Sequence, residues 1–173
     1  MKFDVRCQPV ELLLSDVDGV LTDGRLVFDN QGIETKAFHV RDGLGVKLWR
    51  RAGYRFGVIT SRTSHIVKTR AAELSFDVLR QGVEEKLAAV QQVLSDLQLA
   101  PEQAAYIGDD LPDLPVMKYV GLAVAVADAS PEVRAAADLV TKLPGGAGAV
   151  REAIENILKA KRRWEDLIQK YVG

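Results

Sequence analysis

Short apolar runs alternate along this chain with longer segments of helical period. The runs are rich in branched side chains and are predicted to be strands at residues 12–14, 55–60, 76–79, 104–107, 122–126 and 139–141. Helices are predicted between them at residues 44–52, 64–74, 83–97 and about 111–119, with a further helix start at Ser130 and Pro131. This alternation predicts an α/β fold, a doubly wound, Rossmann-like parallel sheet with helices on both faces.

Two segments depart from the alternation. Residues 26–29 and 34–38 flank Asn30, Gln31 and Gly32, which predicts a β-hairpin flap over about residues 25–39, beside the end of the first strand. From Gly148 the chain is predicted to form one helix, about residues 148–172, whose last turns can dock on another subunit. Since no repeat or linker is visible, residues 1–173 are expected to form a single domain without a large cap domain.

Composition and charge narrow the class of protein. The 173 residues are 47% hydrophobic and 27% charged, as in a soluble globular domain. Lysine and arginine number 23 against 24 acidic residues, so the net charge of -1 offers no field for nucleic acid or a membrane surface. Cys7 is the single cysteine, and neither a cleavable leader nor a long apolar run is present. We therefore expect a cytoplasmic protein that binds neither nucleic acid nor membranes.

The first candidate for chemistry is the pair Asp16 and Asp18, directly after the first predicted strand. Ligands of open α/β sheets gather at the carboxyl ends of the strands, where both carboxylates are expected. One carboxylate can attack phosphorus while the other handles the proton of the leaving oxygen. The alternative is a solvated turn, because aspartate and glycine are common after strands.

A second acidic cluster, Asp109, Asp110 and Asp113, follows the strand predicted at residues 104–107. Three carboxylates so close together repel one another unless a cation compensates them. Mg²⁺ takes one or two carboxylates together with substrate phosphate, which suits two strand-end aspartate clusters that meet. The competing interpretation is the preference of aspartate for helix N-termini, which accounts for Asp110 or Asp113 better than for Asp109.

Thr60 and Lys86 lie between the two acidic clusters in the sequence. Thr60 closes a predicted strand and Lys86 is near the start of a predicted helix, so a hydroxyl and an ammonium can bind phosphate oxygens. Each alone is weak, because threonine is common in strands and lysine is common on solvated helix faces. Their order along the chain carries the information.

That order, Asp-x-Asp, Thr, Lys and Gly-Asp-Asp-x-x-Asp, resembles the four motifs of the haloacid dehalogenase superfamily. Within it the chain resembles the 3-deoxy-D-manno-octulosonate 8-phosphate (KDO 8-phosphate) phosphatases, most closely at residues 16–24, 40–45, 106–115 and 126–129. The resemblance implies a Mg²⁺-dependent phosphatase of lipopolysaccharide biosynthesis that hydrolyses a small sugar acid phosphate through an aspartyl-phosphate. By similarity, the catalytic residues are Asp16 as nucleophile, Asp18 as general acid and base, and Thr60 and Lys86 as phosphate binders. The metal is expected on Asp16, the Asp18 carbonyl and Asp109.

The substrate and the assembly are less directly encoded. Without a cap, the site would be open to water unless neighbouring subunits close it, so we expect a homotetramer with active sites at subunit interfaces. Arg41 and Arg62 are candidates to bind the sugar carboxylate, or else are surface charges. Relatives that act on nine-carbon sugar acid 9-phosphates tend to be acidic where this chain has Arg62, which favours the eight-carbon substrate. Two departures from the family, Ser61 in place of glycine and the tail beyond Lys159, touch substrate fit.

Three other kinds of protein remain as alternatives. A phosphoacceptor signalling domain also uses aspartates, a threonine or serine, a lysine and Mg²⁺, but its acidic pair comes first along the chain. A dehalogenase needs neither Asp18 nor a metal, and a non-catalytic module would be expected to lack one of these groups. We expect no metal role for His39 or His65, a solvated face for residues 159–163, and a turn with a helix start at residues 145–148.

Overall fold

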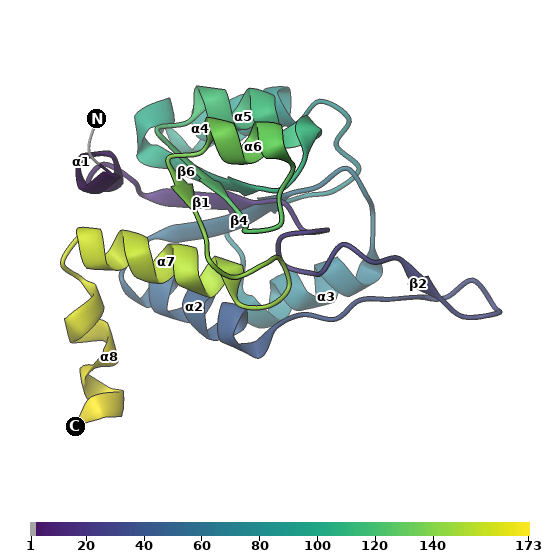
Figure 1. Ribbon diagram of the computed structural model, residues 1–173, viewed down its shortest axis with the longest axis horizontal. Helices are drawn as coiled ribbons and strands as arrows, with labels where there is room; N and C mark the ends of the chain where they lie inside the picture. Colours follow the sequence, from purple (N-terminus) through teal and green to yellow (C-terminus); the bar gives the residue numbers. More distant parts are fainter. Residues whose placement is uncertain (1–2) are drawn as a thin grey trace.

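A six-stranded parallel sheet forms the centre of the computed structural model, which describes residues 3–173 (Figure 1). Its strands are β1 (Leu12–Ser15), β4 (Arg55–Ile59), β5 (Val78–Arg80), β6 (Ala104–Gly108), β7 (Leu122–Ala125) and β8 (Leu139–Val140). They lie in the order β5-β4-β1-β6-β7-β8, and every neighbouring pair is parallel. The predicted α/β fold is confirmed, and β1 occupies the middle of the sheet between β4 and β6.

Helices cover both faces of this sheet. One face carries α4 (Lys86–Leu97), α5 (Leu114–Tyr119) and α6 (Pro131–Ala136), and the other carries α2 (Val40–Arg51), α3 (His65–Leu74) and α7 (Ala149–Ala160) (Figure 1). Two short 3₁₀ turns, η1 (Pro101–Gln103) and η2 (Leu111–Asp113), precede β6 and α5. Because a strand covered on both faces has no solvent side, the first three residues of β1, Leu12, Leu13 and Leu14, are apolar and fully buried.

The predicted hairpin is confirmed, with strands of only two residues each. β2 (Val27–Phe28) pairs antiparallel with β3 (Glu34–Thr35), and the hairpin projects from the body of the molecule (Figure 1). The Asp29 carboxylate accepts the N–H groups of Gln31 and Ile33 at 2.8 and 2.9 Å, which closes the turn. The apolar side chains of the hairpin are about half exposed: Leu26, Val27, Phe28 and Ile33.

The prediction of one C-terminal helix over residues 148–172 was wrong. The chain forms α7 and then α8 (Trp164–Val172), separated by a turn in which Arg162 has a left-handed φ of 56°. The turn brings Trp164 and Leu167 onto the body of the protein, where both are buried. Two helices joined by a turn bury the apolar face of α8, whereas one continuous helix would leave that face in water. The burial therefore favours the bent arrangement.

The same turn corrects the prediction of a solvated basic run at residues 159–163. Lys161 donates from its ammonium to the backbone carbonyls of Cys7, Gln8 and Val10 at 3.1, 2.7 and 3.0 Å. These carbonyls follow or end α1 (Phe3–Cys7), a short helix that the hydrophobic pattern did not predict. The prediction of a solvated face therefore fails at Lys161, which ties the two ends of the described chain together.

Among residues 3–173, no helix is long and apolar enough to span a lipid bilayer.

Candidate active site

The strand ends bring the predicted site residues to one edge of the sheet. Asp16 follows β1, Thr60 follows β4 and Asp109 follows β6, and these three strands are neighbours. Their carboxyl ends open into a cavity of about 210 Å³. Ten residues line it: Asp16, Asp18, Thr60, Ser61, Arg62, Lys86, Asp109, Asp110, Pro112 and Asp113.

Asp16 is held from two sides. Its Oδ1 accepts the N–H of Val17 at 2.7 Å, and its Oδ2 lies 2.8 Å from the ammonium of Lys86, the first residue of α4. Burial, followed by repulsion from the Asp113 carboxylate, outweighs Lys86 and raises the pKa of Asp16 to about 6. A carboxylate held at both oxygens in this way has a fixed orientation beside the cavity that it lines.

Asp109 is the least compensated acid of the site. Burial and the charges of Asp16 and Asp113 raise its pKa to about 8, and its Oδ1 is buried without a hydrogen-bond partner among residues 3–173. Carboxylate oxygens of Asp16, Asp109 and Asp113 all lie within 4.8 Å of one another. Three converging carboxylates with one unpartnered buried oxygen fit a hard divalent cation, which would remove the repulsion between them.

Asp113, although close to the other two acids, has both oxygens occupied. Its Oδ1 accepts from the Lys86 ammonium and the Tyr106 hydroxyl, each at 2.7 Å, and its Oδ2 accepts the N–H of Asp109 at 3.0 Å. Asp113 is fully buried, so these donors stabilise its charge where water cannot. It supports Lys86 and the Asp109 loop, and of the three acids in the described chain only Asp109 keeps a buried oxygen without a partner.

The sequence did not reveal this role for Asp113, which it interpreted as part of an acidic cluster around a cation, with a helix N-terminus as the alternative. Two signals were present. Tyr106 stands in the middle of a buried strand, where its hydroxyl requires a partner. Gly108 is also informative, because a Cβ at that position would lie 2.6 Å from the Cβ of Asp113.

Gly19 places the backbone of the Asp18 loop against Asp109. It has a φ of 90°, and a Cβ there would lie 2.1 Å from Asp109 Oδ2. On the other side, Gly145 lies so close that a Cβ would be 1.7 Å from the Gly19 carbonyl oxygen. The glycine segment 145–148 does precede a helix as predicted, and it also packs on the loop that carries Asp18.

Asp18 is contacted by the hairpin. Its Oδ1 forms an ion pair with the ammonium of Lys36, and its Oδ2 lies 3.8 Å from Nε of Arg62. Glu34 Oε1 in turn accepts from Arg62 Nη2 at 2.7 Å and lies 3.3 Å from Lys36 Nζ. Sequence reasoning missed Lys36 and Glu34, because a lysine and a glutamate in a hairpin strand match no motif.

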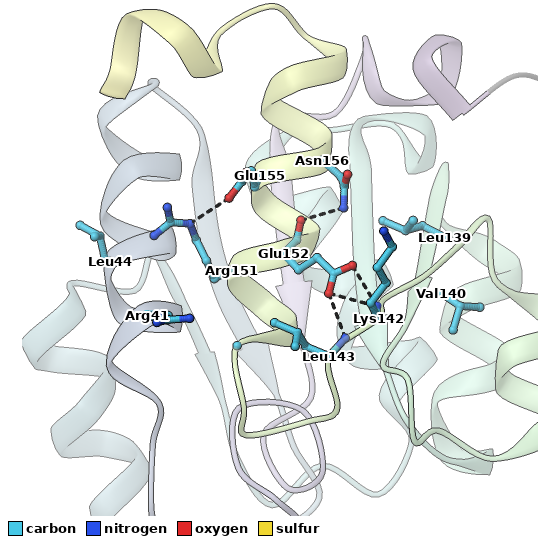
Figure 2. A pocket seen from close by; sticks show the side chains of 11 residues that line it. Arg41, Leu44, Leu139, Val140, Lys142, Leu143, Arg151, Glu152, Glu155 and Asn156 are labelled. Atoms are coloured by element: carbon cyan, nitrogen blue, oxygen red, sulfur yellow. Dashed lines mark hydrogen bonds and ion pairs between the residues drawn. The ribbon is translucent and has the colours of Figure 1, made fainter. Parts of the chain in front are cut away.

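Thr60 and Arg62 line the same cavity as the two acidic clusters, whereas Arg41 does not. Thr60 is buried, and its backbone N–H donates to the backbone carbonyl of Arg80 at 2.9 Å. Arg41, in the first turn of α2, lines a separate and larger cavity of about 770 Å³ beside α7 and β8 (Figure 2). Within one chain, the structure therefore brings together every predicted site residue except Arg41.

The two histidines lie outside the acidic cluster. His39 is the N-cap of α2, and its Nδ1 accepts the N–H of Arg41 at 3.2 Å. His65 begins α3. Within the described residues, neither histidine is part of the cluster that can hold a cation, which consists of Asp16, Asp109 and Asp113.

Two aspartate clusters that follow parallel strands, with the buried Lys86 at the start of α4 beside them, define a class of enzyme, the haloacid dehalogenase-like hydrolases. A family model of that description matches residues 55–154, more than half of the chain. The hairpin in place of a large cap, together with near full-length relatives, narrows the class to one family. The chain belongs to the family of 3-deoxy-D-manno-octulosonate 8-phosphate phosphatases, as the resemblance predicted.

The relatives cover almost the whole chain. The phosphatase KdsC of Yersinia pestis is 47% identical over 160 residues, which cover 92% of this chain and 86% of that protein. The solved Moraxella catarrhalis enzyme, in complex with a magnesium ion, a phosphate ion and KDO, has a TM-score of 0.95 and 38% identity and covers 97% of both chains. The cobalt-bound Haemophilus influenzae enzyme has a TM-score of 0.91 and 39% identity over 97% of this chain and 99% of that one.

Proposed function

We propose that this protein hydrolyses 3-deoxy-D-manno-octulosonate 8-phosphate to the free sugar acid and phosphate, with Mg²⁺ as its metal. The observation that carries the proposal is the pair of carboxylates at the end of β1, Asp16 and Asp18, each ion-paired with its own lysine and facing one cavity. Relatives named for this reaction support the choice of substrate.

Asp16 is the nucleophile in this proposal. Its Oδ2 is fixed by Lys86, so the carboxylate needs little reorganisation to attack phosphorus in line with the leaving oxygen. Asp18 then gives a proton to the departing alcohol and takes one from the water that cleaves the aspartyl-phosphate. Phosphate monoesters react with water so slowly that enzymes reach accelerations of up to about 10²¹-fold, so charge compensation has to accompany positioning.

Lys86 and Thr60 supply part of that compensation by binding phosphoryl oxygens. Asp16, the Asp18 carbonyl and Asp109 would hold Mg²⁺, which when bound neutralises the charge of the phosphoryl group. The free, buried Oδ1 of Asp109 supports this choice of ligands. Asp113 orients Lys86 and keeps its ammonium charged through the reaction.

Arg62 is the residue of this chain best placed to bind the sugar carboxylate, since it lines the acid cavity. Arg41 can serve the same purpose only in the site of a neighbouring chain. A homotetramer with sites at subunit interfaces would provide such neighbours and would cover the half-exposed apolar side chains of the hairpin. We place the protein in the cytoplasm, in lipopolysaccharide biosynthesis.

The experiment that tests the function measures phosphate release from a panel of sugar phosphates, with Mg²⁺ and with excess chelator. We expect the highest kcat/KM for the eight-carbon substrate and no release in chelator. Asp16→Asn is the control for contaminating phosphatases and should be inactive. A higher kcat/KM for the nine-carbon 9-phosphate would contradict the assigned substrate. The absence of Mg²⁺-dependent phosphate release from every ester would contradict the assignment of phosphatase activity.

A further inference from the structure

We propose that Lys36, supplied by the hairpin, is a positioning residue for Asp18 and orients this carboxylate for proton transfer to the leaving oxygen. The inference rests on the proposed function of Asp18 as general acid and base. It gives the hairpin a chemical role within its own chain, in addition to any role in assembly.

The burial of Lys36 is the first observation. Its side chain is 1% exposed, although lysine is among the residues most rarely buried. Removal of an ammonium from water costs several kcal/mol unless carboxylates compensate it. Two do so here, Asp18 and Glu34.

The hairpin strand directs these two side chains to the same side. From Arg25 to Lys36, every residue is exposed except Glu34 and Lys36. Side chains alternate along an extended segment, and Glu34 in β3 and Lys36 directly after it both point toward Asp18 and Arg62, which line the acid cavity. The rest of the hairpin projects into solvent (Figure 1). The buried face of the hairpin therefore consists of one acid and one base, both in contact with site residues.

The two buried lysines of the site divide between the two carboxylates. Lys86 binds Asp16 and is supported by Asp113, whereas Lys36 binds Asp18 and is supported by Glu34. Lys86 therefore belongs to the side of the nucleophile and Lys36 to the side of the leaving group. The Lys36 ammonium, on the side of the leaving group, can fix the orientation of Asp18 and is not needed to hold Asp16.

The contacts of Asp18 show which oxygen is left for chemistry. Lys36 occupies Oδ1, while the nearest cation to Oδ2 is Arg62 Nε at 3.8 Å, beyond hydrogen-bond distance. Oδ2 is thus available to the leaving oxygen. During the first step the bond between Asp16 and phosphorus forms, the ester P–O bond breaks, and the Asp18 proton passes to the departing oxygen. Without Lys36, Asp18 can rotate away from that oxygen.

This role differs in a measurable way from simple anchoring of the hairpin. A sugar alkoxide is a poor leaving group and requires a proton, whereas 4-nitrophenolate departs without one. Loss of a positioned general acid costs on the order of 10²- to 10⁴-fold for the ester that needs the proton. Damage to the phosphate site or to the fold would slow both esters alike.

The test compares the first-turnover rate of alcohol release from the sugar phosphate and from 4-nitrophenyl phosphate in the wild type and in Lys36→Met. We expect Lys36→Met to slow the sugar ester by about 10²-fold and the aryl ester by about tenfold less than that. Lys118→Met, an exposed lysine on α5, is the matched control and should leave both rates unchanged. Equal losses for the two esters, or no loss, would overturn the proposal.

Two further variants keep the proposal testable if Lys36→Met does not fold. Glu34→Gln removes the support of Lys36 while preserving the size of the side chain, and Lys36→Arg retains a cation in an altered position. Both should slow the sugar ester more than the aryl ester, and equal losses in both would again overturn the proposal. A wild type inactive on every ester would instead refute the proposed function, whereas an active wild type with unselective variants refutes only the role of Lys36.

Discussion

The ionised form of Asp109 is destabilised by its surroundings in the folded protein. Burial and the charges of Asp16 and Asp113 raise its pKa from an ordinary 3.8 to about 8. The folded protein therefore binds more protons than the unfolded chain between these two values. The stabilising contribution of this proton is complete below the ordinary pKa and is lost as the pH rises toward about 8.

We expect the thermal midpoint of the metal-free protein to fall as the pH is raised from about 5 to about 8. Mg²⁺ binds the deprotonated acids, so it should raise the midpoint more at the upper end of this range than at the lower end. Asp109→Asn cannot ionise and should show a smaller decrease with pH. For a chain of this size, about 1 kcal/mol corresponds to about 2–4 °C, which differential scanning calorimetry resolves.

The control is Asp96→Asn, an exposed aspartate on α4, which should retain the wild-type dependence on pH. A midpoint of the metal-free protein that rises from about pH 5 to about pH 8, or an Asp109→Asn variant identical to wild type, would contradict the assignment of the repulsion to Asp109.

At the scale of single residues, the sequence predicted the groups that carry motifs, Asp113 among them, but not the contacts by which one residue supports another. Asp16, Asp18 and Asp109 are marked by their spacing after apolar strands. Lys36 and Asp113 are defined by partners far away in the chain, 18 and 27 residues from Asp18 and Lys86 respectively. No local pattern encodes such a contact, which exists only after the sheet has formed.

At the scale of elements, the hairpin combines a buried polar face with an exposed apolar one. Phe28 is 54% exposed, and its neighbours on the hairpin are similar. Exposed apolar side chains gathered on a projecting hairpin favour contact with another surface. This arrangement is the structural basis for expecting a tetramer, in which each hairpin would be covered by other chains.

Phe28→Ser should therefore weaken assembly, because burial of a phenylalanine side chain is worth about 1.5–3 kcal/mol in each copy. We expect light scattering at matched concentrations to give a tetramer for the wild type and smaller species for the variant. Val5→Ser removes an equally exposed apolar side chain from α1 and should remain tetrameric. A wild type that is a fully active monomer would refute the shared site.

Helices and strands were predicted correctly where a local apolar pattern determines them, and wrongly where tertiary packing determines where a helix ends. The strands and most helices follow from apolar runs and their period. The break between α7 and α8 depends on the hydrogen bonds that Lys161 donates to the carbonyls after α1 and on the burial of Trp164. A helical period continues through both segments, so the sequence alone could not reveal the turn.

At the scale of the whole molecule, the strand order explains why distant motifs meet. β1 lies between β4 and β6, so the loops after these three strands converge from positions around 16, 60 and 109. The sequence predicted a parallel sheet without its order. It predicted that the two aspartate clusters meet, because both follow strands of one parallel sheet, and the resemblance to a family added Thr60 and Lys86 to the same site.

The central claim is that phosphate passes through a covalent bond to Asp16, and rapid-quench labelling tests it most directly. Asp18→Asn is mixed with ³²P-labelled 4-nitrophenyl phosphate and Mg²⁺, quenched in acid and mapped by peptide. Since the aryl group leaves without a proton, labelling should proceed while hydrolysis of the intermediate is slowed. We expect the label on the peptide that contains Asp16 and none in the Asp16→Asn variant. Release of 4-nitrophenol with no label on Asp16 at any time would contradict the mechanism.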